Sequence, residues 1–224
     1  MSNYLVIDTS AHTSVAVIDA NGTVHAEITS ERSNDQTETL VSYIHQLLAQ
    51  AGLEGKELAG IIVGTGPGPF TGLRVGLVAA RTLSYVWGVP LHGTMSLGAL
   101  AERVRRELQP DTEYLIATDA RRREVYWARF AADGKLLDGP HVSAPGELPS
   151  LEVHGVGAGL YAQELEEAGA KVAGASRDWL TRAADLGPRA LAELAAGADL
   201  SDTAPRYLRE SDAQVPQFMK QAKS

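Results

Sequence analysis

A loop of alternating glycine and proline constrains the fold of this chain more than any other stretch. It runs from Gly64 to Arg74 (GTGPGPFTGLR), between a short apolar segment at 60–63 and an apolar run at 75–87. Glycine permits positive φ and close backbone approach, whereas proline fixes φ at about −65°. The pattern predicts a stiff connection between a buried strand and a helix over 72–87, with Thr71 as the helix N-cap.

A glycine-rich loop before a helix can also bind phosphate, because the helix N-terminus presents free amide groups. The Walker A pattern requires a lysine, and none occurs in 64–74. Pro69 stands where a dinucleotide fingerprint needs its third glycine, and Pro67 and Pro69 remove two amide donors. A structural turn is therefore favoured, and direct phosphate binding stays the alternative.

Composition excludes several classes of protein. The 224 residues suffice for one large domain or two small ones, and 44% hydrophobic with 21% charged residues is typical of a globular protein. A formal charge of −8 does not favour independent binding to nucleic acid. The absence of cysteine excludes disulfides, thiolate metal sites and cysteine nucleophiles. With no secretion signal or long apolar run in view, a cytoplasmic protein that avoids membranes is expected.

The first half of the chain alternates between strand and helix patterns. Strands are expected at 4–7, 13–18 and 23–30, with a hairpin turn at Asn21-Gly22, so that they form an antiparallel meander. A helix over 37–51 should bury an apolar stripe made of Leu40, Val41, Ile44, Leu47, Leu48 and Ala51. After the loop and its helix come a short strand at 89–93 and a helix at 96–108.

The pattern restarts near residues 110–112. Strands are expected at 113–118, 124–131 and 153–156, with a hairpin continuing at 135–137, a loop at 139–149, and helices near 160–168 and at 184–196, the last beginning at Asp185 with Pro188 in its first turn. The tail from about 211 should fray. This order predicts an α/β protein of the actin-like fold with two similar lobes, 1–109 and 110–224.

Two carboxylates follow predicted strands at matching places in the two halves. Asp8 and Asp119 stand where open α/β folds place ligands, and in an actin-like ATPase they would orient magnesium and water beside phosphates. Alternatively, each carboxylate caps the turn that follows it. The second interpretation is favoured, because the Asp8 turn lacks a glycine-rich, lysine-bearing hairpin and Arg121 closely follows Asp119.

Other catalytic and binding patterns are absent or ambiguous. The six histidines show no HxxH, HxxxH or HExxH spacing, and there is no GxSxG elbow, so neither a metal site nor a hydrolase serine is indicated. Two basic groups, at 103–106 and 121–123, either contact RNA phosphates within a complex or are simply solvated.

The helix over 72–87 is the most informative element. Gly76, Ala79 and Ala80 give it a face that can approach other backbone closely, while apolar residues spread around nearly its whole circumference. A helix of this kind is buried on all sides, either inside its own domain or under a partner. We expect a partner.

Four segments resemble the TsaB (YeaZ) family, the accessory subunit of the bacterial machinery that makes threonylcarbamoyladenosine at adenosine 37 of tRNA. They are DTS at 8–10, the loop at 64–74, DARRREVYWA at 119–128 and PRYLR at 205–209. The resemblance runs from about residue 4 to 209 and is weak at 139–200. It implies a non-catalytic scaffold with degenerate nucleotide and metal sites, and hence no catalytic, cofactor-binding or metal-binding residues of its own.

The resemblance also implies partners. The chain would bind the catalytic paralogue TsaD through the helices at 37–51 and 72–87, the ATPase TsaE would join them, and the chain alone would form a homodimer. ATP, magnesium and tRNA would be met only within the complex. The expected interface residues are Thr39, Tyr43, Arg74, Val78, Arg81 and Tyr85. A divergent ATPase or sugar-kinase-like enzyme is the alternative, and a metallopeptidase is a less favoured one.

Overall fold

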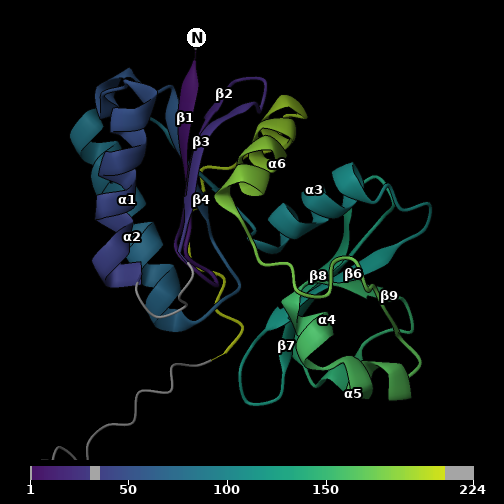
Figure 1. Ribbon diagram of the computed structural model, residues 1–224. Helices are drawn as coiled ribbons and strands as arrows, with labels where there is room; N and C mark the ends of the chain where they lie inside the picture. The colour runs from purple at the N-terminus through teal and green to yellow at the C-terminus, as the bar shows by residue number, and fades with distance from the viewer. Residues whose placement is uncertain (1, 31–35, 210–224) are drawn as a thin grey trace, which may run out of the picture.

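Two five-stranded sheets with the same strand order form the molecule (Figure 1). The computed structural model describes residues 2–30 and 36–209, so the tail expected to fray from 211 lies outside the described residues. The first sheet, in the order β3-β2-β1-β4-β5, contains β1 (Asn3–Asp8), β2 (Ser14–Asp19), β3 (Val24–Thr29), β4 (Gly60–Gly64) and β5 (Leu91–Thr94).

The second sheet repeats this arrangement as β8-β7-β6-β9-β10. It contains β6 (Tyr114–Asp119), β7 (Val125–Phe130), β8 (Leu136–Ser143), β9 (Glu152–His154) and β10 (Lys171–Val172). In both sheets an antiparallel meander of three strands comes first, and two further strands run parallel to its first member. The predicted two-lobed α/β architecture of the actin-like type is confirmed.

Helices cover both faces of the first sheet. The helices on this sheet are α1 (Gln36–Ala51), α2 (Phe70–Trp87) and α6 (Ala183–Ala195). The other helices of the described residues are η1 (Gly55–Glu57), α3 (Leu97–Glu107), η2 (Pro145–Glu147), α4 (Val156–Leu160) and α5 (Ala162–Glu167). Figure 1 shows α1 and α2 on one face and α6 on the other. Alternate residues of β1 point to opposite faces, so Leu5 and Ile7 pack toward α1 and α2 while Val6 packs toward α6.

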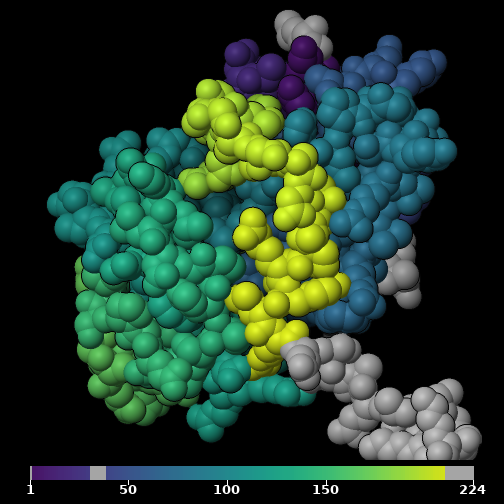
Figure 2. Space-filling view, turned by 180° about the vertical axis from the view of Figure 1, so that it is seen from behind, coloured from purple at the N-terminus to yellow at the C-terminus, as the bar shows by residue number. Residues whose placement is uncertain are grey.

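The C-terminal part of the chain returns to the first sheet. After the strands of the second sheet, α6 packs on β1, β2 and α3. Gly187 makes this contact close, because a Cβ there would lie 2.5 Å from Ile18 Cδ1. The segment that follows α6, yellow in Figure 2, then runs between the two lobes. The division of the chain at residue 109 stays a prediction.

Three local predictions are wrong. α2 begins at Phe70, and the carbonyl of Pro69 rather than the Thr71 hydroxyl receives its first helical bond, from Leu73 N–H at 3.0 Å. Residues 139–143 belong to β8 instead of a loop, because Pro140 lies on an edge strand at a register irregularity, where its missing N–H is not required. Asp185 lies in the first turn of α6, which begins after Arg182, and Pro188 lies inside the helix.

Candidate functional site

One face of α2 is exposed along the length of the helix. Val78, Tyr85 and Val86 are 60%, 90% and 67% exposed, whereas Leu73, Leu77 and Ala80 on the opposite face are buried. Steps of three and four residues place Arg74, Val78, Arg81 and Tyr85 on one side. Burial of α2 inside its own domain is therefore wrong, and coverage of this face by a partner stays a prediction.

The neighbouring surface of α1 differs in part from expectation. Val41, placed in the buried stripe by its spacing, is 65% exposed beside α2. Tyr43 is half-buried against the core, and Thr39 is half-buried and donates to Thr13 Oγ1 at 3.2 Å. Two apolar residues of this surface, Val41 and Val86, were thus missed as interface candidates. We call the exposed side of the two helices the α1/α2 face.

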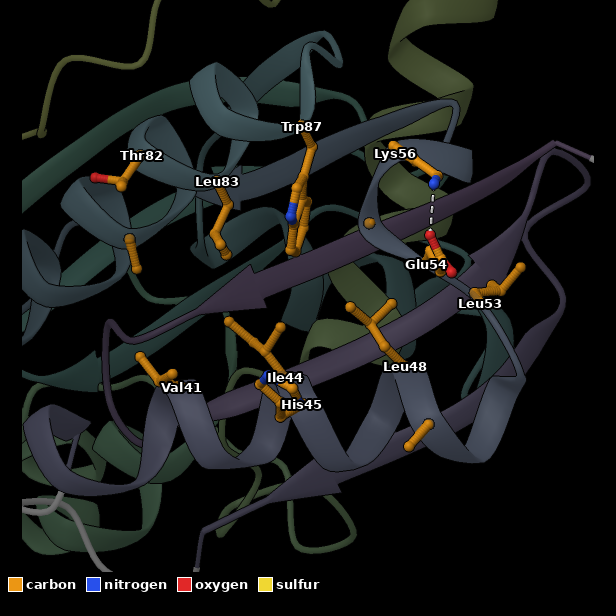
Figure 3. A pocket seen from close by; sticks show the side chains of 13 residues that line it. Val41, Ile44, His45, Leu48, Leu53, Glu54, Lys56, Thr82, Leu83 and Trp87 are labelled. Atoms are coloured by element: carbon orange, nitrogen blue, oxygen red, sulfur yellow. Dashed lines mark ion pairs between the residues drawn. The ribbon is translucent and has the colours of Figure 1, made fainter.

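An apolar groove of about 770 Å³ lies between α1, α2 and η1 (Figure 3). Ile44 and Leu48 of α1 face Leu83 and Trp87 of α2 across it, and the exposed ion pair of Glu54 and Lys56 marks one end. The Trp87 indole packs directly on Gly55, where a Cβ would lie 2.1 Å from the ring. Such a groove can bury apolar side chains at about 25 cal/mol per Å² of apolar area.

Arg74 and Arg81 are exposed, yet both contact the segment after α6. The Arg74 guanidinium lies 3.6 Å from the centre of the Phe70 ring and donates to the Tyr207 hydroxyl at 3.0 Å. Arg81 donates to the carbonyl oxygen of Thr203 at 2.8 Å and to its Oγ1 at 3.1 Å. These predicted interface residues therefore have intramolecular partners.

The glycine–proline loop uses its amide groups within the fold. Thr65 N–H donates to Thr94 O at 2.8 Å, and Gly66 N–H donates to Ser96 Oγ at 3.1 Å. Gly68 packs on the backbone of Ser10, whose carbonyl oxygen would lie 2.5 Å from an added Cβ. These contacts support the structural turn over a phosphate-binding loop.

Asp8 and Asp119 make the same local contact at equivalent strand ends. Asp8 Oδ1 accepts the Ser10 N–H at 2.9 Å, and Asp119 Oδ1 accepts the Arg121 N–H at 2.8 Å. The turn-capping interpretation is thus confirmed for both. Asp8 is fully buried, and burial raises its pKa despite hydrogen bonds from the Ser10 and Thr181 hydroxyls.

Replacing Gly64 with alanine is expected to destabilise the fold by about 1–3 kcal/mol, because the new Cβ would overlap the buried carboxylate. That Cβ would lie 1.9 Å from Asp8 Oδ2 and 2.6 Å from Ser96 Oγ. Urea denaturation measures the change. Gly146→Ala is the matched control, since nothing lies within 4 Å of its Cβ; equal midpoints for the two variants would contradict this packing.

A small cleft of about 220 Å³ separates the lobes near these carboxylates. Ser10, His12 and Pro69 line it from the first lobe. Asp119 and Arg121 line it from the second, with the apolar side chains of Val156 and Leu160. Both predicted carboxylate positions therefore lie at or beside one cleft, although only Asp119 lines it.

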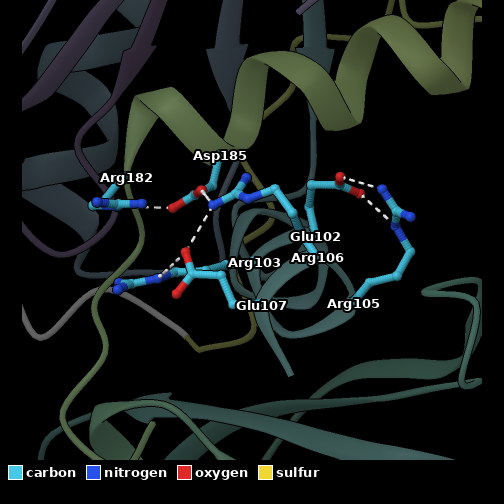
Figure 4. Close-up of polar contacts among 7 residues, drawn as sticks. All are labelled: Glu102, Arg103, Arg105, Arg106, Glu107, Arg182 and Asp185. Atoms are coloured by element: carbon cyan, nitrogen blue, oxygen red, sulfur yellow. Dashed lines mark hydrogen bonds and ion pairs between the residues drawn. The ribbon is translucent and has the colours of Figure 1, made fainter. Parts of the chain in front are cut away.

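The basic group at 103–106 is occupied by internal ion pairs (Figure 4). Arg106 and Arg182 bind the two oxygens of the buried Asp185 carboxylate at 2.7 and 2.8 Å, and so join α3 to α6. Arg105 pairs with Glu102 at 2.6 Å, and Arg103 stacks 3.8 Å from the Trp179 ring centre. Its arginines thus have partners within the fold, so a simply solvated group is wrong for 103–106, and contact with RNA phosphates stays a prediction.

The basic group at 121–123 forms a tight turn between β6 and β7. All three arginines have positive φ, of 60°, 54° and 61°. Left-handed backbone costs about 1–2 kcal/mol per non-glycine residue. Arg121 pairs with Asp119, and the largely exposed Arg123 pairs with Glu164, each at 3.3 Å. Acidic neighbours thus offset part of the positive charge of this turn.

No group of three or more histidine, aspartate or glutamate side chains in the described part of the chain could hold a metal ion. Across residues 2–30 and 36–209, no helix has the length and apolar character needed to cross a membrane.

Two lobes of equal strand order that meet at a narrow cleft define a protein of the actin-like class. A family model described as TsaD, tRNA N6-adenosine threonylcarbamoyltransferase, matches residues 6–177. The chain belongs to this family, and within it to the TsaB (YeaZ) proteins, as its relatives show.

The relatives differ in how much of each chain they match. The uncharacterized protein ML0378 of Mycobacterium leprae is 39% identical over 150 residues, which are 65% of this chain and 40% of that protein. The tRNA threonylcarbamoyladenosine biosynthesis protein TsaB of Escherichia coli is 30% identical over 129 residues, 58% of this chain and 55% of that protein. The chain thus spans about half the length, or less, of these two relatives.

A solved structure matches nearly the whole chain. It is a Pseudomonas aeruginosa protein described as uncharacterized with similarity to peptidase YEAZ. The two structures superpose with a TM-score of 0.79 and 26% identity, over 93% of this chain and 100% of that one.

Proposed function

We propose that this chain is a non-catalytic scaffold subunit that binds TsaD and supports threonylcarbamoyl transfer to adenosine 37 of tRNA. The carrying observation is the α1/α2 face, where large apolar side chains are exposed beside an apolar groove. Exposed apolar patches of this kind are typical of protein–protein interfaces. The TsaB relatives, which are named for threonylcarbamoyladenosine biosynthesis, supply the reaction.

The proposal includes the rest of the assembly. TsaE joins the complex, ATP and magnesium bind to the partners, and tRNA is met only through the assembled complex, in the cytoplasm. Without TsaD, two copies of the chain cover the α1/α2 face of each other.

Size-exclusion chromatography with light scattering tests the proposal directly. The chain is mixed with TsaD of the same organism, with and without ATP and TsaE. A complex with the mass of a heterodimer, or of a higher assembly that contains both chains, supports the scaffold. Separate elution of the two proteins under all conditions would contradict it.

An enzyme of the same fold is the second candidate, and the inter-lobe cleft with Asp119 and the nearby Asp8 favours it. Calorimetry of the isolated chain with MgATP separates the two functions. Tight binding that is lost in Asp8→Ala would favour a divergent ATPase or sugar kinase, whereas no binding favours the scaffold. The metallopeptidase alternative requires bound zinc, which metal analysis of the purified protein tests.

A further inference from the structure

The segment 199–209 has no regular secondary structure, yet it is held at both lobes (Figure 2). At its start, Gly93 N–H of β5 donates to Leu200 O at 2.8 Å. The backbone then passes so close to β5 that a Cβ on Gly93 would lie 2.4 Å from Asp202 O. Asp199 and Asp202 cap their own turns by accepting the N–H groups of Ser201 and Ala204. The segment is therefore stiff and firmly seated on the first lobe.

Its middle contacts α2 and the glycine–proline loop. Arg206 N–H donates to Thr65 O at 2.8 Å, which adds a backbone contact to the side-chain bonds of Arg74 and Arg81 described above. The Tyr207 ring lies 4.6 Å from the Phe70 ring, centre to centre. The positions of both α2 arginines thus depend on this segment.

Its end reaches the second lobe. Arg209 donates to the carbonyl oxygen of Ala120 at 2.9 Å and forms an ion pair with Glu124. Phe70 and Ala120 are the chain neighbours of Pro69 and Arg121, which line the inter-lobe cleft from opposite sides. Between Tyr207 and Arg209 the segment therefore crosses from one wall of the cleft to the other.

We propose that residues 199–209 form a strap that holds the two lobes together across this cleft and fixes Arg74 and Arg81 on the α1/α2 face. The strap reaches the second lobe at Ala120, at the opposite end of β6 from the chain connection at 108–113. The other connection, at 180–183, lies at the same cleft, which Leu180 lines. Its second role, orienting the two arginines for a partner, rests on the proposed function.

The lobe connection is tested by electron paramagnetic resonance with spin labels at Asn21→Cys and Glu166→Cys. The chain contains no native cysteine, so these exposed positions carry the only labels. Arg209→Ala should broaden the distribution of distances between the labels. It should also speed hydrogen exchange at the Arg206 amide by about tenfold, as the loss of a charge-assisted bond predicts.

Arg123→Ala is the matched control, because it removes an arginine from the turn that Arg209 contacts, and Arg123 pairs with Glu164 of the second lobe. Unchanged distances and exchange in Arg209→Ala, or equal changes in the control, would overturn the strap.

The second role is tested by binding of TsaD to Arg209→Ala and to Tyr207→Phe, which loses the hydroxyl that accepts from Arg74. Weaker binding supports it, and wild-type affinity overturns it. If the wild-type chain fails to bind TsaD, the proposed function and this second role fall, while the distance measurement still decides the strap.

Discussion

Replacing Val78 with glutamate is expected to weaken the complex with TsaD by about 100-fold or more. Burial of a carboxylate without a partner costs about 3–5 kcal/mol, and each 1.4 kcal/mol is about tenfold in affinity. The free chain should keep its fold, because Val78 is 60% exposed and glutamate favours helix over valine. Isothermal titration calorimetry measures the affinity, and thermal unfolding of the free chain checks the fold.

Leu137→Glu is the matched control for this variant. Leu137 is also an exposed apolar residue, at 45%, but it lies on β8 in the second sheet, away from α1 and α2. It should bind TsaD as the wild type does. Wild-type affinity in Val78→Glu would show that TsaD does not cover this part of α2.

The order of the elements along the chain and most of their positions were predictable, because they depend on local patterns. The apolar runs that end at Asp8 and Asp119 predict β1 and β6, and the repeat of the strand pattern near residue 110 predicts the second sheet. The capping role of the two carboxylates was predictable for the same reason, since each one binds an amide only two residues away.

The details of the candidate site were less accessible to the sequence. A step of one residue turns a helix by about 100°, which carries the Val41 side chain away from the buried face that Leu40 occupies. The apolar spacing alone did not show this. The circumference of α2 is apolar in sequence, and only the packed sheet shows which side is exposed. The partners of Arg74 and Arg81 are 133 and 122 residues away along the chain, beyond the reach of any local pattern.

His154 is expected to make the protein less stable in acid, through a mechanism that no motif indicated. Its ring is buried on β9, Nδ1 lies 2.7 Å from Ser176 Oγ, and Nε2 has no hydrogen-bond partner among the described residues. Burial lowers the pKa of His154 from 6.5 to about 4. Between these two pKa values the imidazole therefore binds a proton in the unfolded chain but not in the native state.

The sign of the effect follows from that difference. The stability associated with His154 is complete above about pH 6.5 and is lost progressively as the pH falls toward 4, by about 3 kcal/mol in all, since one pKa unit corresponds to about 1.4 kcal/mol. Urea denaturation at intervals between pH 7.5 and about 4.5 measures this slope. His154→Gln, which can still bond to Ser176 but does not titrate, should flatten it.

The titration of Asp8 does not hide that of His154. Because burial raises the pKa of Asp8, its contribution to stability falls as the pH rises, opposite in sign to that of His154. Asp8 is present in both the wild type and His154→Gln, so its contribution cancels in the difference between their slopes. Equal slopes of the unfolding free energy against pH for the wild type and His154→Gln would contradict the prediction, because the folded state would then bind the imidazole proton as readily as the unfolded chain does.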